Sequence, residues 1–138
     1  MSENESEFMA RAKQLRADTS RHYNCAQSVF IPFAEAKGMD TETAFAIADN
    51  FGAGMRVASV CGGITGALMA LGLWGMNDPK MVTEYFRAIK SRHDGHTDCA
   101  SLLAANAAKG LPKKPHCDAM VFENVEMVEE ILKNTGKI

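Results

Sequence analysis

Residues 59–73 read SVCGGITGALMALGL, and this stretch decides the fold. It is apolar and long enough for a helix, yet it contains four glycines. A glycine inside a helix costs about 1 kcal/mol relative to alanine, so a compensating role is expected. Gly62, Gly66 and Ala70 fall at i, i+4 and i+8 and therefore share one helical face. We expect a buried helix whose flat face lets a second helix, or a bound cofactor, approach its backbone.

The wider apolar stretch, residues 57–76, approaches the length of a membrane span, which needs about 20 strongly apolar residues. Glycines interrupt it and Arg56 directly precedes it. Glycines also occur in membrane helices, but a buried helix of a soluble protein is the favoured interpretation. The N-terminal MSENESEF lacks the basic and apolar regions of a secretory signal. We therefore expect a cytoplasmic protein with no membrane span.

The length and charge of the chain limit the class of protein further. A chain of 138 residues is expected to form one domain, residues 1–138, with residues 1–5 flexible. The formal net charge is -2 and no run of lysines or arginines stands out. Neither nucleic acid nor an anionic membrane surface is therefore an expected partner.

Apolar periodicity and capping residues predict helices along the rest of the chain. Asn24 and Gln27 have the spacing of a capping box, and Asp78-Pro79 is a typical helix start. Pro32 is expected to kink its helix or divide it, and the two prolines of residues 111–116 predict a loop. No alternating strand pattern of convincing length is present, so the expected fold is all-α, a compact single-domain bundle of about six helices. Beside residues 59–73, the predicted helical segments are 3–22, 25–37, 41–51, 79–93, 99–109 and 117–133.

The first of these segments is predicted to be an amphipathic surface helix. Phe8, Ala12 and Leu15 share one face of it, at i, i+4 and i+7. Arg16 and the other basic residues of the segment are expected to be solvated.

Four cysteines are spread widely over the sequence: Cys25, Cys61, Cys99 and Cys117. No pair forms a Cys-x-x-Cys motif, which argues against thioredoxin-like sites, zinc knuckles and local ferredoxin motifs. In a reducing cytoplasm such thiols are more often catalytic, redox-sensing or metal-binding than structural disulfides.

The local context of each cysteine suggests reactivity. Cys25, Cys99 and Cys117 fall at predicted helix N-termini, where the dipole and free N–H groups favour a thiolate. Cys61 enters the glycine-rich helix, where small neighbours leave its sulfur accessible. We predict that the four sulfurs meet at one site. The alternative is that they are small buried apolar residues.

Three histidines lie close to these cysteines in the sequence. His116 adjoins Cys117, and His22 and His96 each precede a cysteine by three residues. They would complete a mixed site or lower nearby thiol pKa values. Solvent-facing or capping histidines near helix ends are the favoured interpretation.

The cysteine pattern resembles that of a known family. Cys25, in Asn-Cys-Ala-Gln-Ser-Val, corresponds to the family's first cysteine. Residues 61–66, Cys-Gly-Gly-Ile-Thr-Gly, resemble its Cys-Gly-Ala-x-x-Gly signature, with Gly63 in place of alanine. Cys99 and Cys117 match the third and fourth cysteines. Over about residues 23–122 the chain thus resembles the C_GCAxxG_C_C family of redox-active proteins.

The resemblance implies an all-helical fold and a redox role. It also implies kinship with the non-haem part of split-Soret cytochromes, where comparable cysteines hold an iron–sulfur cluster. The leading hypothesis is therefore an electron-transfer protein with an iron–sulfur cluster, [2Fe–2S] being the favoured type. The four cysteines would be its metal ligands, and Gly62, Gly63 and Gly66 would lie against the cofactor.

Two other hypotheses stay open. The same four cysteines would be the catalytic groups of a metal-free thiol–disulfide protein. They would otherwise bind zinc in a structural or metal-sensing module, although such sites usually use closely spaced pairs. Whether the protein is an enzyme is left open, as is the identity of a redox partner protein. The glycine-rich face would also suit a homodimer.

Overall fold

The computed structural model describes residues 5–138, and these form an all-α fold with no β-strand in the described range. The expected fold class is confirmed, with seven α-helices where about six were expected. Within the described range, no helix combines the length and the apolar character that a membrane crossing requires. The expected flexibility of residues 1–5 falls almost wholly outside the described residues. The helices are α1 (Glu7–Ala17), α2 (Cys25–Ala36), α3 (Thr41–Ala48), α4 (Gly62–Leu73), α5 (Pro79–Arg92), α6 (Cys99–Ala108) and α7 (Lys113–Asn134).

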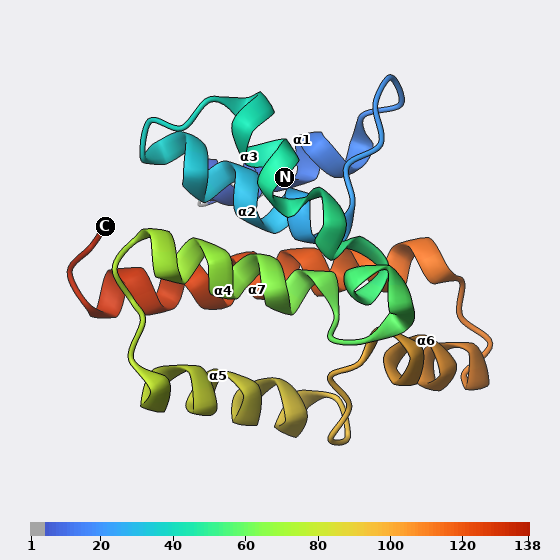
Figure 1. Ribbon diagram of the computed structural model, residues 1–138. Helices are drawn as coiled ribbons and strands as arrows, with labels where there is room; N and C mark the ends of the chain where they lie inside the picture. The colour runs from blue at the N-terminus through green and yellow to red at the C-terminus, as the bar shows by residue number, and fades with distance from the viewer. Residues whose placement is uncertain (1–4) are drawn as a thin grey trace.

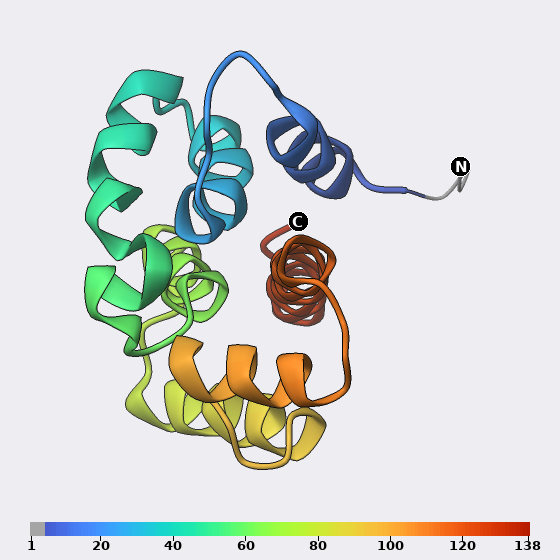
Figure 2. The same ribbon diagram turned by 90° about the vertical axis from the view of Figure 1, so that its right-hand side faces the viewer.

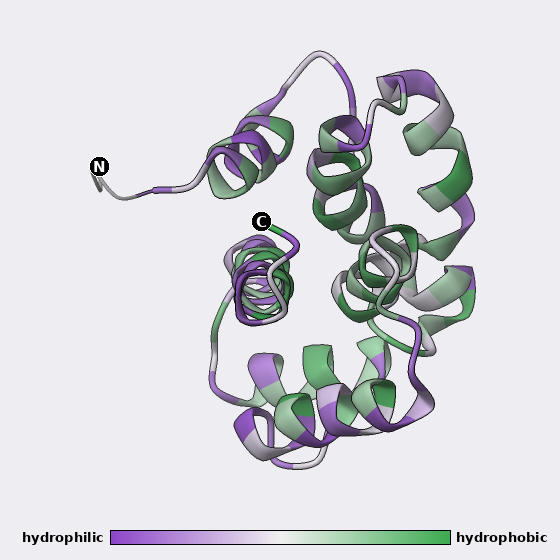
Figure 3. Cartoon of the chain, turned by 90° about the vertical axis from the view of Figure 1, so that its left-hand side faces the viewer, coloured by the Kyte–Doolittle hydropathy of each residue, from purple (hydrophilic) through white to green (hydrophobic). Residues whose placement is uncertain are grey.

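The central pair of helices is α4 and α7, which run side by side (Figure 1). Seen along their axes, α1, α2 and α3 cover one side of this pair, and α5 and α6 cover the other (Figure 2). Helix α2 contacts both α4 and α7. Most of α2 and α4 is hydrophobic (Figure 3), and a helix that is apolar all round must be buried.

The glycines of α4 explain how closely it packs. A Cβ atom at Gly66 would lie 2.6 Å from the carbonyl oxygen of Ala26 in α2, and one at Gly62 would lie 3.1 Å from the Ala26 nitrogen. On a neighbouring face, a Cβ at Gly63 would lie 3.0 Å from Nδ2 of Asn124 in α7. The expected close approach of a second helix is therefore confirmed, and α7 approaches in the same manner.

The start of α2 has the capping box that the sequence predicts. The Asn24 side chain accepts from the Gln27 N–H at 2.8 Å, and the Gln27 side chain accepts from the Asn24 N–H at 2.9 Å. The Asn24 amide also donates to the Asp49 carbonyl at 3.1 Å. The capping box satisfies two of the free backbone donors at the helix start, the N–H groups of Asn24 and Gln27. These hydrogen bonds fix Cys25, the first residue of the helix, against the chain that follows α3.

Two predictions about the N-terminal helices are corrected. Helix α1 ends at Ala17 rather than at residue 22, because the Asp18 carboxylate accepts from the Ser20 and Arg21 N–H groups and holds a turn. Pro32 does not divide α2, which is continuous from Cys25 to Ala36. The lost hydrogen bond is offset by burial, since Pro32 lies among fully buried apolar neighbours in this helix.

The last helix begins earlier than the sequence indicates. Helix α7 starts at Lys113, after Pro112 as N-cap, and not at residue 117. Pro115 therefore lies in the first turn, where a backbone N–H has no partner within the helix and its absence costs little. Of the predicted loop, residues 111–116, only the first two residues precede the helix; residues 113–116 form the first turn of α7, and Cys117 lies in the second turn.

The chain before α4 contains an unusual turn at residues 53–58, most of whose residues have left-handed backbone conformations. Ala53, Met55, Arg56 and Ala58 all have φ between 52° and 63°. For non-glycine residues this conformation costs roughly 1–2 kcal/mol each. Gly54 also has positive φ, and a Cβ there would lie 2.9 Å from the Cβ of Cys99. The strained turn is thus packed directly against one of the four cysteines.

Candidate functional site

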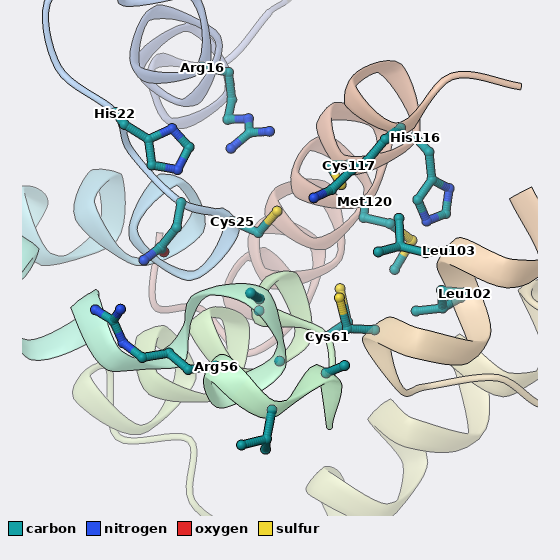
Figure 4. Close-up of a pocket in the computed structure, with 18 residues that line it drawn as sticks. Arg16, His22, Cys25, Arg56, Cys61, Leu102, Leu103, His116, Cys117 and Met120 are labelled. Atoms are coloured by element: carbon teal, nitrogen blue, oxygen red, sulfur yellow. The ribbon is translucent and has the colours of Figure 1, made fainter. Parts of the chain in front are cut away.

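All four cysteines line a single pocket with a volume of about 430 Å³ (Figure 4). They come from four parts of the chain: Cys25 and Cys99 begin α2 and α6, Cys61 is the N-cap of α4, and Cys117 lies in α7. All four are free thiols. The structure therefore brings together the four residues that the sequence singled out, while their chemical roles stay predictions.

Backbone pairing brings Cys61 and Cys99 together. The Cys61 N–H donates to the Thr97 carbonyl at 2.9 Å, and the Cys99 N–H donates to the Ser59 carbonyl at 2.6 Å. The two segments run antiparallel for this one bridge. Each segment then enters a helix, so the bridge places the starts of α4 and α6 side by side. Sequence reasoning did not anticipate this pairing, which joins residues about 40 positions apart.

Cys25 and Cys117 form the second pair. The Cys25 thiol hydrogen-bonds to Cys117, and this bond raises the pKa of Cys25 and lowers that of Cys117 to about 6. Burial adds to the rise in the pKa of Cys25 and opposes the fall in that of Cys117, whereas the nearby positive charge of Arg16 lowers both pKa values. The pair is therefore polarised, with Cys117 as the thiolate and Cys25 as the proton donor.

Cys61 and Cys99 are protonated at neutral pH. Burial raises the pKa of Cys61 to about 11, although the backbone N–H groups of Gly63 and Ile64 oppose the shift. Burial likewise raises the pKa of Cys99. The prediction that a helix start favours the thiolate is wrong for Cys99, as it is for Cys25. Of the four thiols, the one with a lowered pKa, Cys117, is not at a helix N-terminus.

The charged residues that line the pocket are all cationic. Arg16, Arg56 and Lys113 contribute to the lining, and within residues 5–138 no carboxylate does. His22 and His116 also line the pocket, whereas His96 does not. The pocket is therefore suited to negative charge, as thiolates or as a bound anionic group.

Arg16 lines the pocket, but the sequence predicted it to be solvated. Its side chain is only 9% exposed rather than solvated. Its Nε donates to Asp118 at 2.7 Å, and one terminal nitrogen donates to the Tyr23 carbonyl at 2.9 Å. The guanidinium is directed toward the region between α1, Cys25 and Cys117 (Figure 4). A weak signal existed, because Arg16 follows the buried Ala12 by four residues and so borders the buried face.

The pocket contains the type of side chains that bind a metal cofactor, but these side chains are not already arranged around a metal position. Among the described residues, no three His, Cys, Asp or Glu side chains already form a group that would hold a metal ion. The donor set nevertheless fits, because four thiols share one pocket whose charged lining is cationic. Gly62 lines this pocket, whereas Gly63 and Gly66 pack against α7 and α2. Contact of these glycines with a cofactor stays a prediction.

Redox centres and metal-binding centres both use sets of thiols, and this pocket contains four of them. The family model described as "Putative redox-active protein (C_GCAxxG_C_C)" matches residues 23–131, and the chain belongs to this family. No curated protein and no solved structure matches the chain. Family membership supports a redox role and confirms the resemblance drawn from the cysteine pattern.

Proposed function

We propose that this protein transfers electrons through an iron–sulfur cluster bound by Cys25, Cys61, Cys99 and Cys117. The observation that carries the proposal is that four cysteines from four separate elements line one pocket. Four cysteine thiolates are the usual ligands of [2Fe–2S] and [4Fe–4S] clusters, and the smaller cluster is the favoured type here. The cluster would supply one-electron transfer, and the protein would supply the four ligands and their surroundings.

The charge of the pocket supports the same proposal. A cluster with four thiolate ligands carries net negative charge, and burying that charge requires compensation. Arg16, Arg56 and Lys113 line the pocket and provide positive charge. Arg16 is held in place by Asp118, so its charge is fixed beside the thiols. Cluster potentials depend on nearby charge and hydrogen bonds, and these cations would raise the potential.

Anaerobic purification tests this proposal directly. Protein expressed with ample iron is expected to be coloured and to contain iron and acid-labile sulfide in equal amounts, with two of each per chain for a [2Fe–2S] cluster. The measurements are iron and sulfide analysis, a visible spectrum and electron paramagnetic resonance after reduction. Colourless protein without iron from such a host would contradict the proposal, and stoichiometric zinc would support the structural zinc alternative.

A metal-free thiol–disulfide activity is a second candidate, favoured by the contact between Cys25 and Cys117. The Cys117 thiolate would attack a disulfide of a partner and release one of its sulfurs as a thiolate. Cys25 would then attack Cys117 in the mixed disulfide, and its proton would pass to the second leaving sulfur. The partner disulfide would be reduced to a thiol and a thiolate, while Cys25 and Cys117 would be oxidised to a disulfide.

The pH dependence of alkylation tests this polarised pair in the iron-free protein. Because the pKa of Cys117 is lowered to about 6, its thiolate persists at neutral pH and is lost as the pH falls through about 6. Iodoacetamide is expected to label one cysteine rapidly, with half-maximal rate near pH 6, and peptide mass spectrometry would identify it as Cys117. Arg16→Gln should move the midpoint to higher pH. A midpoint above pH 8 in the unmodified protein would contradict the pairing.

A further inference from the structure

A second pocket, of about 350 Å³, adjoins the cysteine pocket. It shares Arg16, His22, Lys113 and Cys117 with that pocket, so Cys117 borders both. Its own walls come from the end of α1, the turn after it and the first turn of α7. In Figure 4, Arg16 and His22 lie on the side of Cys25 away from Cys61. The cluster proposed above would use Cys117, Arg16 and Lys113 of this lining, but not Lys114 or the turn after α1.

The charged side chains that line the second pocket are mostly cationic. Arg16, Lys113 and Lys114 line it, and Asp18 is the one carboxylate among the described residues that does. The Asp18 carboxylate accepts hydrogen bonds from the Ser20 N–H at 2.7 Å and the Ser20 hydroxyl at 2.6 Å. These bonds lower the pKa of Asp18, so it keeps its negative charge. The three cations outnumber the two anionic groups of the lining, Asp18 and the Cys117 thiolate. Asp118 pairs with Arg16 and Lys114 from outside the lining, so Lys113 is the cation without an ion-pair partner among the described residues.

Arg16 has hydrogen-bonding capacity left over. Its Nε is bonded to Asp118 and one terminal nitrogen to Tyr23. Within residues 5–138 the other terminal nitrogen has no hydrogen-bond partner. Because no buried side-chain nitrogen in that range lacks a partner, this nitrogen is accessible from outside the protein. A guanidinium normally binds a carboxylate or phosphate with two parallel N–H donors. This remaining donor, on a side chain that lines the pocket, is available to a ligand.

The start of α7 supplies a second, independent argument. Lys113 and Lys114 occupy the first two positions of a 22-residue helix that has no acidic residue in its first turn. The positive end of the helix dipole makes cations there unfavourable, by roughly 0.3–1 kcal/mol each. Lys114 is partly compensated by Asp118 at 3.3 Å, whereas Lys113 has no ion-pair partner within the described range. A bound anion would relieve this repulsion and use the free N–H groups of the first turn.

We propose that this second pocket binds a small molecule through a carboxylate or phosphate group held by Arg16, Lys113, Lys114 and the first turn of α7. The pocket is large enough for a small metabolite, and the ligand would lie beside Cys117. That such a molecule exchanges electrons with the site rests on the proposed function, whereas the binding itself does not.

Calorimetric titration of the full-length protein tests the binding. Inorganic phosphate and malonate serve as the two probes, with sodium chloride at matched ionic strength as the blank. We expect one saturable site for at least one probe, and the better probe identifies the group recognised. Lys113→Gln should weaken binding about tenfold, the loss expected for one charge-assisted hydrogen bond. Lys133→Gln, the same change at the opposite end of α7, should leave the affinity within about twofold.

Two results would overturn the inference: no saturable binding of either probe, or equal affinities of the Lys113→Gln and Lys133→Gln proteins. If circular dichroism shows that Lys113→Gln is unfolded, Lys114→Gln provides the same comparison. Failure of the inference and failure of the proposed function are distinguishable. Iron-free protein that binds phosphate refutes only the cluster, and iron-loaded protein that binds neither probe refutes only the second pocket.

Discussion

Replacing Gly66 by alanine is expected to lower the free energy of unfolding by about 2 kcal/mol, while Gly72→Ala raises it by about 0.5–1 kcal/mol. Both glycines lie within α4, so both changes gain helix propensity. A Cβ at Gly66 would lie 2.6 Å from the carbonyl oxygen and 3.0 Å from the Cα of Ala26, whereas a Cβ at Gly72 meets no atom within 4 Å. The obstacle at Gly66 is backbone, which cannot rotate away, so α2 and α4 must separate.

Urea denaturation followed by circular dichroism measures this difference, with Gly72→Ala as the matched control. Gly66→Val should be more destabilising still, because it adds two further methyl groups at the same contact. If Gly66→Ala were as stable as Gly72→Ala, the close packing of α4 on Ala26 would be refuted. The change should also disturb the site, since Cys25 precedes Ala26 directly and Cys61 precedes α4 directly.

Capping residues and apolar periodicity correctly predicted those features of the fold that depend on residues close together in the sequence. The capping box of Asn24 and Gln27, and the start of α5 at Asp78-Pro79, are settled within a few residues of chain. The start of α7 was missed because Pro115 was treated as a helix breaker, although a first-turn proline is harmless. The left-handed turn around Arg56 leaves no such local signature, because its strain is offset by packing against Ser59 and Cys99.

The candidate site likewise has features that the sequence predicted and features that it did not. The four cysteines could be singled out as candidate site residues because thiols are rare and because their spacing matches a family pattern. The pairing of Cys61 with Cys99 depends on a backbone bridge between distant segments, which no local pattern encodes. The pKa values depend on burial and on the contact between Cys25 and Cys117, and these outweigh the helix-terminus effect on which the sequence argument relied.

Alanine substitution of each cysteine in turn should separate the two candidate functions. Cys61→Ala and Cys99→Ala are each expected to reduce the iron bound after anaerobic expression to less than about a tenth of the unmodified level, because each removes a ligand. Both variants retain Cys25 and Cys117, so rapid alkylation near pH 6 should persist. Cys25→Ala should abolish both properties, because it removes a ligand and also the hydrogen bond that stabilises the Cys117 thiolate.

Ser101→Ala is the matched control for Cys99→Ala, since it also removes one side-chain heteroatom from α6. It should leave iron content and alkylation unchanged. Full iron content in the Cys61→Ala and Cys99→Ala proteins would exclude a cluster held by all four cysteines. Absence of iron from the unmodified protein, together with persistent alkylation near pH 6, would restrict the redox chemistry to Cys25 and Cys117. Loss of iron with persistent alkylation would instead show that the polarised pair of Cys25 and Cys117 forms without a cluster. The fold alone would then position these two thiols before a cluster binds.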